Sequence, residues 1–182
     1  MDSNVLTYLV QSSRRNYYPT ADRQNLGLKV QKQTIYWLSR YLDGIYVPPT
    51  VRSEVEKIIH YRRRKSHQSL LENLLVDILP KQCVGCTERA AYFSQFHTSK
   101  SQKEAARRLK DCHVLAEAES AGIQVLLSFD GNFIKNLEEH VALIRLERPS
   151  ALWARLGIPP GTLSRWAPAP DNPTKSQRWR KR

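Results

Sequence analysis

Four carboxylates stand next to apolar segments that would hold them in place, although the chain as a whole is basic. They are Asp2, Glu54, Asp111 and Asp130, and the amide of Asn132 follows the last of them. Carboxylate oxygens are the ligands that Mg²⁺ and Mn²⁺ prefer, and an ion held by several of them can activate water and stabilise negative charge. The pattern therefore predicts a divalent-metal site to which separate elements contribute one acid each.

The segment before Asp130 predicts where the last acid lies. Residues 125–129, VLLSF, are typical of a buried strand, and Asp130, Gly131 and Asn132 follow it directly. Because open parallel sheets bind ligands beyond the carboxyl ends of their strands, this carboxylate and amide are expected at a ligand-binding edge. The alternative is an ordinary turn, which Asp followed by Gly also favours.

Asp111 and Glu54 are predicted to stand on helices. Asp111 shares a helical face with Val114, Leu115 and Ala118, so its carboxylate would be held near the core at one end of an apolar stripe. Glu54 stands in the first turn of its predicted helix. The helix dipole alone also explains an acid in that position.

The elements that must position these acids follow from the apolar periodicity. It predicts helices over residues 5–10, 28–42, 51–64, 69–79, 103–121, 133–137 and 151–156, one or two helical turns near 90–96, and strands over 45–47, 125–129 and 141–146. Thr50 is the predicted N-cap of the helix over 51–64, and Gly122 ends the longest helix. Strands that alternate with helices indicate an α/β fold with a central parallel sheet flanked by helices.

Composition divides the chain into a domain and a tail. The predicted domain covers residues 1–148, and residues 149–182 form a last helix followed by a tail rich in proline and basic residues. No apolar run is long enough to span a membrane, and no basic region followed by an apolar stretch marks a secretory signal. The expected location is therefore the cytoplasm.

The charge predicts a polyanionic partner. The chain carries 29 Lys and Arg against 17 Asp and Glu, a formal net charge of +12. Basic side chains that neutralise phosphates release counterions, which favours nucleic-acid binding. The candidate phosphate contacts are Arg62, Arg63, Arg64, Lys65, Arg107, Arg108, Lys110 and Arg180. The alternative for these residues is a set of solvated helix faces and a tail that aids solubility.

The three cysteines, Cys83, Cys86 and Cys112, are expected to be reduced thiols in a chain without an export signal. Together with His113 they reach the number of ligands of a zinc site. Because Cys112 and His113 are adjacent, tetrahedral ligation by both is awkward. Small buried thiols are the simpler interpretation.

Four stretches, in order, resemble the motifs of the PIN domain, a nuclease family that includes the toxins of many bacterial toxin–antitoxin modules. DSNVLTYL begins with Asp2 and resembles the first motif, and VPPTVRSEV resembles the second region with its helical Glu54. DCHVLAEA begins with Asp111 and resembles the third. SFDGNF, with Ser128, Asp130 and Asn132, resembles the fourth. The resemblance extends over residues 2 to about 147.

The resemblance implies a PIN-like three-layer sandwich and an endoribonuclease. Asp2, Glu54, Asp111 and Asp130 would bind one or two Mg²⁺ or Mn²⁺ ions, and Asn132 would be a further ligand beside Asp130. The implied partners are RNA, a cognate antitoxin protein and a second copy of the chain. The basic residues above would then contact RNA.

Two departures from the family pattern leave alternatives open. Only Met1 precedes Asp2, where the family has a hydrophobic strand, so either that strand lies upstream or Asp2 is held less firmly. Ser128 replaces the usual Thr, which keeps an oxygen donor. The alternatives are a catalytically impaired PIN-fold protein that binds nucleic acid and a scaffold in a ribonucleoprotein assembly.

Overall fold

A computed structural model of the chain describes residues 3–12, 34–35, 38–39, 45–73, 77–78, 83–99 and 101–156. Four predictions lie wholly or largely outside these residues: Asp2 as a ligand, Arg180 as an RNA contact, the basic tail, and the helix over residues 28–42. Of that helix, only residues 34–35 and 38–39 are described, and they are helical.

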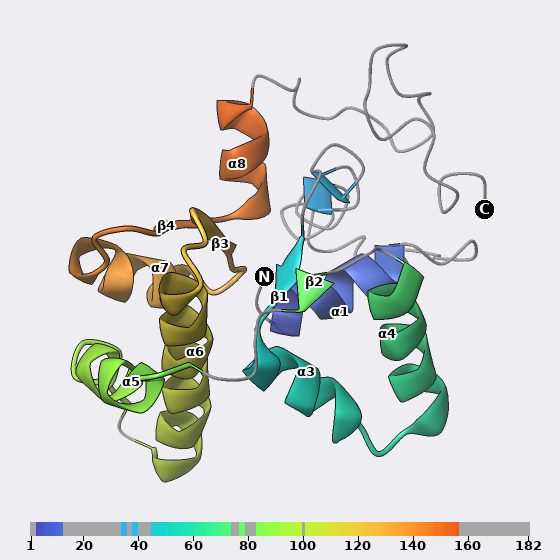
Figure 1. Cartoon of the computed structure of the whole chain (residues 1–182), viewed down its shortest axis with the longest axis horizontal. Helices are drawn as coiled ribbons and strands as arrows, with labels where there is room; N and C mark the ends of the chain where they lie inside the picture. Colours follow the sequence, from blue (N-terminus) through green and yellow to red (C-terminus); the bar gives the residue numbers. More distant parts are fainter. Residues whose placement is uncertain are drawn as a thin grey trace.

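Helices dominate the described residues, with short parallel strands between them (Figure 1). In chain order the elements are α1 (Ser3–Ser12), β1 (Tyr46–Val47), α3 (Pro49–Glu56), α4 (Tyr61–Asn73), β2 (Asp77–Ile78), α5 (Cys86–Ser94), α6 (Gln102–Ser120), β3 (Val125–Leu127), α7 (Gly131–Leu137), η2 (Glu138–His140), β4 (Arg145–Glu147) and α8 (Pro149–Arg155). The fold is therefore broadly α/β, as predicted. None of the described helices is long and apolar enough to cross a membrane.

The described strands form two separate parallel pairs. β1 pairs with β2, and β3 pairs with β4, where Leu126 lies opposite Leu146. A hydrogen bond from the Ser128 amide to the Glu147 carbonyl, at 3.0 Å, continues the second pair toward Asp130. Parallel pairing is confirmed, whereas a single central sheet is not seen among the described residues.

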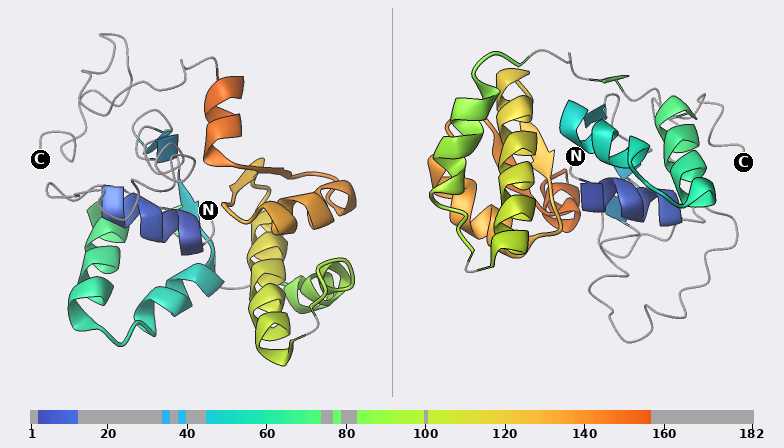
Figure 2. Two further views of the ribbon diagram at one scale, coloured as in Figure 1. Left: turned by 180° about the vertical axis from the view of Figure 1, so that it is seen from behind. Right: turned by 90° about the horizontal axis from the view of Figure 1, so that it is seen from below.

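Helix α6 carries the buried stripe that organises one side of the molecule. Cys112, Leu115, Ala116 and Ala118 are at most 1% exposed, and α5 packs along this helix. Figures 1 and 2 show α5, α6, α7 and the β3–β4 pair gathered on one side, with α1, α3 and α4 on the other. Gly122, at a φ of 67°, ends α6 in the left-handed conformation that glycine tolerates best.

The helix predicted over residues 51–64 is wrong in its continuity: residues 51–56 and 61–64 are helical, but the chain turns at residues 57–60 between α3 and α4. Val51 and Val55 are buried as expected, but Ile59 is 97% exposed. Thr50 does not cap the helix; Pro48 precedes its first turn instead. The turn lets α4 pack against α1, where His67 Nε2 lies 3.4 Å from Thr7 Oγ1.

Two further predicted segments differ from the structure. The helix over 69–79 is wrong, because α4 ends at Asn73 and residues 77–78 form β2, where pairing with β1 overrides the helical periodicity. The strand over 141–146 starts late, at Arg145, and Leu143 is 79% exposed. Apart from the helix over residues 28–42, which lies largely outside the described residues, the remaining predicted helices and strands are confirmed within a few residues of their ends.

Helix α8 packs on the domain rather than standing apart from it. Leu152 and Trp153 are 5% and 4% exposed and belong to the same core as α6 and β4. The Arg155 guanidinium also donates to the Glu147 carboxylate, with Nε at 3.0 Å from Oε1. The proposed division at residue 148 remains a prediction.

Candidate metal centre

Two of the predicted ligands meet a third side chain at one point in the fold. His97, Asp111 and Asp130 each offer one ligand atom, and these atoms lie within 4.8 Å of one another. His97 comes from the segment after α5, Asp111 from the middle of α6 and Asp130 from the residue before α7. The group therefore combines three elements that are distant in the sequence.

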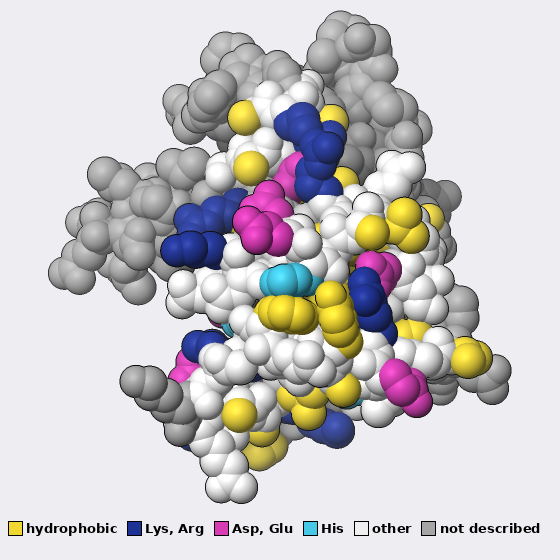
Figure 3. Space-filling view, turned by 90° about the vertical axis from the view of Figure 1, so that its left-hand side faces the viewer, with side chains coloured by type: hydrophobic (Ala, Val, Ile, Leu, Met, Phe, Trp, Pro, Cys, Tyr) yellow, Lys and Arg dark blue, Asp and Glu magenta, His cyan; other side chains and the backbone are white. Residues whose placement is uncertain are grey.

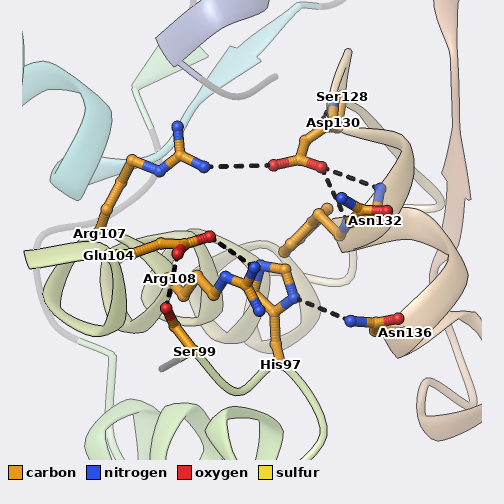
Figure 4. Close-up of polar contacts among 10 residues, drawn as sticks. His97, Ser99, Glu104, Arg107, Arg108, Ser128, Asp130, Asn132 and Asn136 are labelled. Atoms are coloured by element: carbon orange, nitrogen blue, oxygen red, sulfur yellow. Dashed lines mark hydrogen bonds and ion pairs between the residues drawn. The ribbon is translucent and has the colours of Figure 1, made fainter. Parts of the chain in front are cut away.

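The fold fixes Asp130 by capping α7. Its Oδ1 accepts hydrogen bonds from the amides of Asn132 and Phe133, at 2.9 and 3.1 Å, and its own amide donates to Ser128 Oγ. The second carboxylate oxygen, Oδ2, lies 3.7 Å from Arg107 Nη2 (Figure 4). Capping thus explains why an acid stands here, yet it leaves one oxygen directed away from the helix.

His97 is buried, at 2% exposed, and lies between α6 and α7. Its Nδ1 is 3.5 Å from the side-chain nitrogen of Asn136, and its ring meets Phe133 edge to face. Nε2 has no hydrogen-bond partner among the described residues. A buried polar atom without a partner costs roughly 1–3 kcal/mol, so this nitrogen calls for an explanation.

The surroundings of His97 favour its neutral form. Burial, followed by the nearby charge of Arg108, lowers the pKa of His97 below its ordinary value of 6.5. At neutral pH the ring is therefore an uncharged imidazole with one nitrogen lone pair. That is the form in which histidine binds a metal ion.

Asp111 is half-buried on α6, one residue after Lys110 and one before Cys112. Its charge also affects its neighbour, because burial and then Asp111 raise the pKa of Cys112 to about 12. The apolar stripe predicted for this helix is confirmed, with Val114, Leu115 and Ala118 buried. Asp111 is thus held at the edge of the core, as the sequence predicts.

Glu54 lies beside the centre but not in the group of three. Its Oε1 is 3.6 Å from Lys110 Nζ, and its side chain is 32% exposed. The N-terminus of α3 is fixed to α6, because the Thr50 amide and hydroxyl donate to the Glu117 carboxylate at 3.1 and 2.7 Å. The structure therefore brings Glu54 next to α6 and leaves its role as a ligand a prediction. Asn132 is exposed in the first turn of α7.

Basic side chains of α6 flank the acids. Arg107 and Lys110 are 62% and 60% exposed and pair with Asp130 and Glu54. Arg108 is only 17% exposed, and its guanidinium donates to Glu104 Oε1 at 2.6 Å. Because Arg108 is held inside this network, its side chain is less accessible than those of Arg107 and Lys110.

The other predicted RNA contacts lie on a separate side of the molecule. Arg62, Arg63 and Lys65 are exposed on α4, and Arg64 is partly buried. Figures 1 and 2 show α4 on the opposite side of the structure from α6. The basic residues therefore form two groups rather than one continuous surface.

The face that carries α5 and α7 bears acidic and basic side chains together with a band of hydrophobic ones beside a histidine (Figure 3). Between α5 and η2, His140 stacks on Phe96 with ring centroids 3.5 Å apart. Tyr92 meets Phe96 edge to face at 5.2 Å. These rings join α5 to η2, so we interpret them as packing contacts.

The expectation of reduced thiols is wrong for two of the three cysteines. Cys83 and Cys86 form a disulfide that closes the turn before α5, with Cα atoms 5.5 Å apart. Cys112 is free and buried in α6. Among the described residues no metal-ligand group includes a cysteine, so the zinc alternative gains no support.

Sequence reasoning missed His97, because a single histidine outside any motif carries no pattern. A weak signal exists: His97 stands four residues after the buried Phe93, and its amide donates to the Phe93 carbonyl at 3.3 Å. It thus continues the buried face of α5 for one more turn.

In comparisons with known proteins, no family model, no curated protein and no solved structure matches this chain.

Proposed function

We propose that this chain is a metal-dependent endoribonuclease with a PIN-like fold. One observation carries the proposal: Asp111 and Asp130, acids from two separate motifs 19 residues apart, meet beside a third ligand-type side chain. Convergence of ligands from separate elements is what a metal site needs. The type of reaction, cleavage of RNA, is inferred from the resemblance of four motifs, in order, to those of the PIN family.

In this proposal the acids bind the metal ion, and the basic residues beside them bind the RNA. Asp130 Oδ1 is occupied by the helix cap, so Oδ2 is the oxygen available to an ion, and Asp111 would supply a second carboxylate. A bound Mg²⁺ or Mn²⁺ would supply Lewis acidity toward water and the scissile phosphate. Glu54, Asp2 and Asn132 would complete the ligand set.

Arg107 and Lys110 would position RNA beside these acids. Both are largely exposed and lie within 4 Å of an acid, so a phosphate bound by either would lie near the centre. Without an ion, they also neutralise acids that would otherwise repel one another. On this proposal, phosphate and metal replace the ion pairs when substrate binds.

The wider proposal follows from the family resemblance. The chain would be the toxin of a cytoplasmic toxin–antitoxin pair, with an antitoxin segment covering the acidic centre. Homodimerisation would be expected. The three-layer arrangement around one central sheet belongs to the same proposal.

A second candidate is a PIN-fold protein that binds RNA, or serves as a scaffold, without cleaving it. The ion pairs favour this candidate, because Arg107 and Lys110 already neutralise Asp130 and Glu54. Carboxylates that are already paired with an arginine and a lysine need no metal ion to neutralise their charge. The two candidates differ in whether added metal produces cleavage.

Cleavage of labelled RNA by the full chain separates the candidates. We expect cleavage with Mn²⁺, none with EDTA, and its loss in Asp111→Asn and Asp130→Asn. Glu72→Gln, an exposed acid on α4, is the matched control and should cleave as wild type does. Metal-independent cleavage, or cleavage that persists in both Asn variants, would refute the proposal. RNA binding without cleavage would favour the second candidate.

A further inference from the structure

We propose that His97 is a protein ligand of the metal centre and that the centre therefore selects a transition-metal ion, such as Mn²⁺, over Mg²⁺. The inference deepens the proposed metal site and does not require that RNA be cleaved. It rests on two independent observations: the clustering of three ligand atoms, and a buried ring nitrogen without a partner.

The spacing of the three side chains is close to that of a coordination shell. Two ligands that are each about 2.1 Å from an ion lie at most about 4.2 Å apart, twice the metal–ligand distance. The ligand atoms of His97, Asp111 and Asp130 lie within 4.8 Å of one another. Three ligands on one ion lie roughly 3 to 3.6 Å apart, so the side chains would have to close by roughly 1 Å, a shift within the range of side-chain rotation.

The contact with Asn136 identifies which nitrogen of His97 would bind. The two ends of an amide are nearly isosteric, so Asn136 can present its oxygen to Nδ1 as readily as its nitrogen. Nδ1–H then donates to that oxygen, and the lone pair resides on Nε2, the unpartnered atom. Metal-binding histidines commonly have their second nitrogen fixed in this way.

The ligand set determines the preferred ion. Mg²⁺ favours oxygen ligands and retains several waters, whereas an imidazole beside carboxylates suits Mn²⁺, Fe²⁺, Co²⁺ and Zn²⁺ better. Two carboxylates and one neutral imidazole also leave coordination positions for water or a phosphate oxygen. Of the two ions that the sequence suggests, the structure favours Mn²⁺.

The test is metal binding by the full chain, without RNA. The protein is cleared of metal and kept free of reductant, so that the Cys83–Cys86 disulfide stays closed and supplies no thiolate. Co²⁺ is titrated with its visible absorption as the readout, and Mn²⁺ with electron paramagnetic resonance. We expect one ion per chain, little displacement by a large molar excess of Mg²⁺, and a loss of affinity of at least about tenfold in His97→Gln.

Two controls keep the result decisive. His60→Gln removes an exposed histidine at the start of α4 and should bind both ions as wild type does. If His97→Gln fails to fold, ring ¹H–¹⁵N spectra of the wild-type protein give the answer, because Zn²⁺ should shift the Nε2 resonance of His97. Unchanged Co²⁺ affinity in a folded His97→Gln, an unshifted His97 resonance, or equal competition by Mg²⁺ would overturn the inference.

The outcomes distinguish this inference from the proposed nuclease. Metal bound through His97 without RNA cleavage would retain the inference and refute the nuclease. Cleavage that depends on Asp111 and Asp130, supported equally by Mg²⁺ and unaffected by His97→Gln, would retain the nuclease and refute the inference.

Discussion

Arg107 on α6 reaches the residue that caps α7, with Nη2 3.7 Å from Oδ2 of Asp130. This oxygen is the one that the cap leaves for an ion, so the guanidinium occupies the electrostatic position that a cation would take (Figure 4). An arginine in this position would compete with a metal ion bound at the proposed centre and would attract phosphate. Both consequences can be measured separately.

Replacing Arg107 by Gln should strengthen metal binding. Exposed ion pairs contribute roughly 0.2–1 kcal/mol, and Arg107 is 62% exposed, so we expect the Kd for Mn²⁺ to fall by a factor of about 1.4 to 5. Lys103→Gln removes the same charge one helical turn earlier and should have a smaller effect. Weaker Mn²⁺ binding in Arg107→Gln would show that the guanidinium supports the site rather than competing for it.

Asp130 has a structural role that can be separated from its proposed chemical one. Asn at this position can still accept from the amides of Asn132 and Phe133, whereas Ala cannot. We expect Asp130→Ala to lower the free energy of unfolding by about 1 kcal/mol and Asp130→Asn by much less. Urea denaturation measures both. Both variants should lose metal binding, and equal stability losses would argue against the cap.

The same residue shows how far the sequence predicts the site. The apolar run before Asp130 and the apolar face beside Asp111 are local patterns. They were sufficient to predict that Asp130 follows a strand and that Asp111 lies at the edge of the core. The turn between α3 and α4 was not predictable, because Ile58 and Ile59 continue the apolar periodicity across it. His97 was missed for a related reason: its partners come from α6 and α7, and only tertiary packing assembles them.

Glu117 should contribute to stability because it ties α3 to α6. Its carboxylate accepts from both the amide and the hydroxyl of Thr50. Hydrogen bonds to charged groups contribute about 1.5–3 kcal/mol, and Glu117→Ala should lower the free energy of unfolding by an amount in that range. Glu56→Ala, which breaks an exposed pair with Arg52, should cost less than about 1 kcal/mol. Similar losses in both variants would show that Glu117 does not anchor α3.

The cysteines should differ sharply in reactivity. Cys112 is fully buried, and burial with the neighbouring Asp111 raises its pKa to about 12, so almost no thiolate forms near pH 8. Alkylation followed by mass spectrometry should label no cysteine in the untreated protein, Cys83 and Cys86 after reduction, and Cys112 only after unfolding. Labelling of Cys112 in the folded protein at pH 8 would contradict its burial.

The raised pKa of Cys112 also predicts a loss of stability in alkali. The folded thiol keeps its proton up to about pH 12, whereas the unfolded thiol, with a model value of 9.0, loses it earlier. The contribution to stability is therefore complete below about pH 9 and declines as pH rises toward 12. Cys112→Ala should show a shallower decline over this range in urea denaturation. An identical pH dependence in both proteins would show that the thiol does not titrate differently on folding.

The two basic groups should differ in their effect on RNA binding. Arg107 and Lys110 lie beside the acids on α6, whereas Arg62 and Arg63 stand on α4 at the other side of the molecule. Each phosphate contact contributes about 0.7 to the slope of log affinity against log salt for single strands. If RNA runs past the acidic centre, Arg107→Gln with Lys110→Gln should reduce that slope by up to about 1.4, and Arg62→Gln with Arg63→Gln should leave it nearly unchanged. The reverse pattern would place RNA on α4, away from the acids. Cleavage at the centre formed by His97, Asp111 and Asp130 would then require the RNA to extend from one side of the molecule to the other.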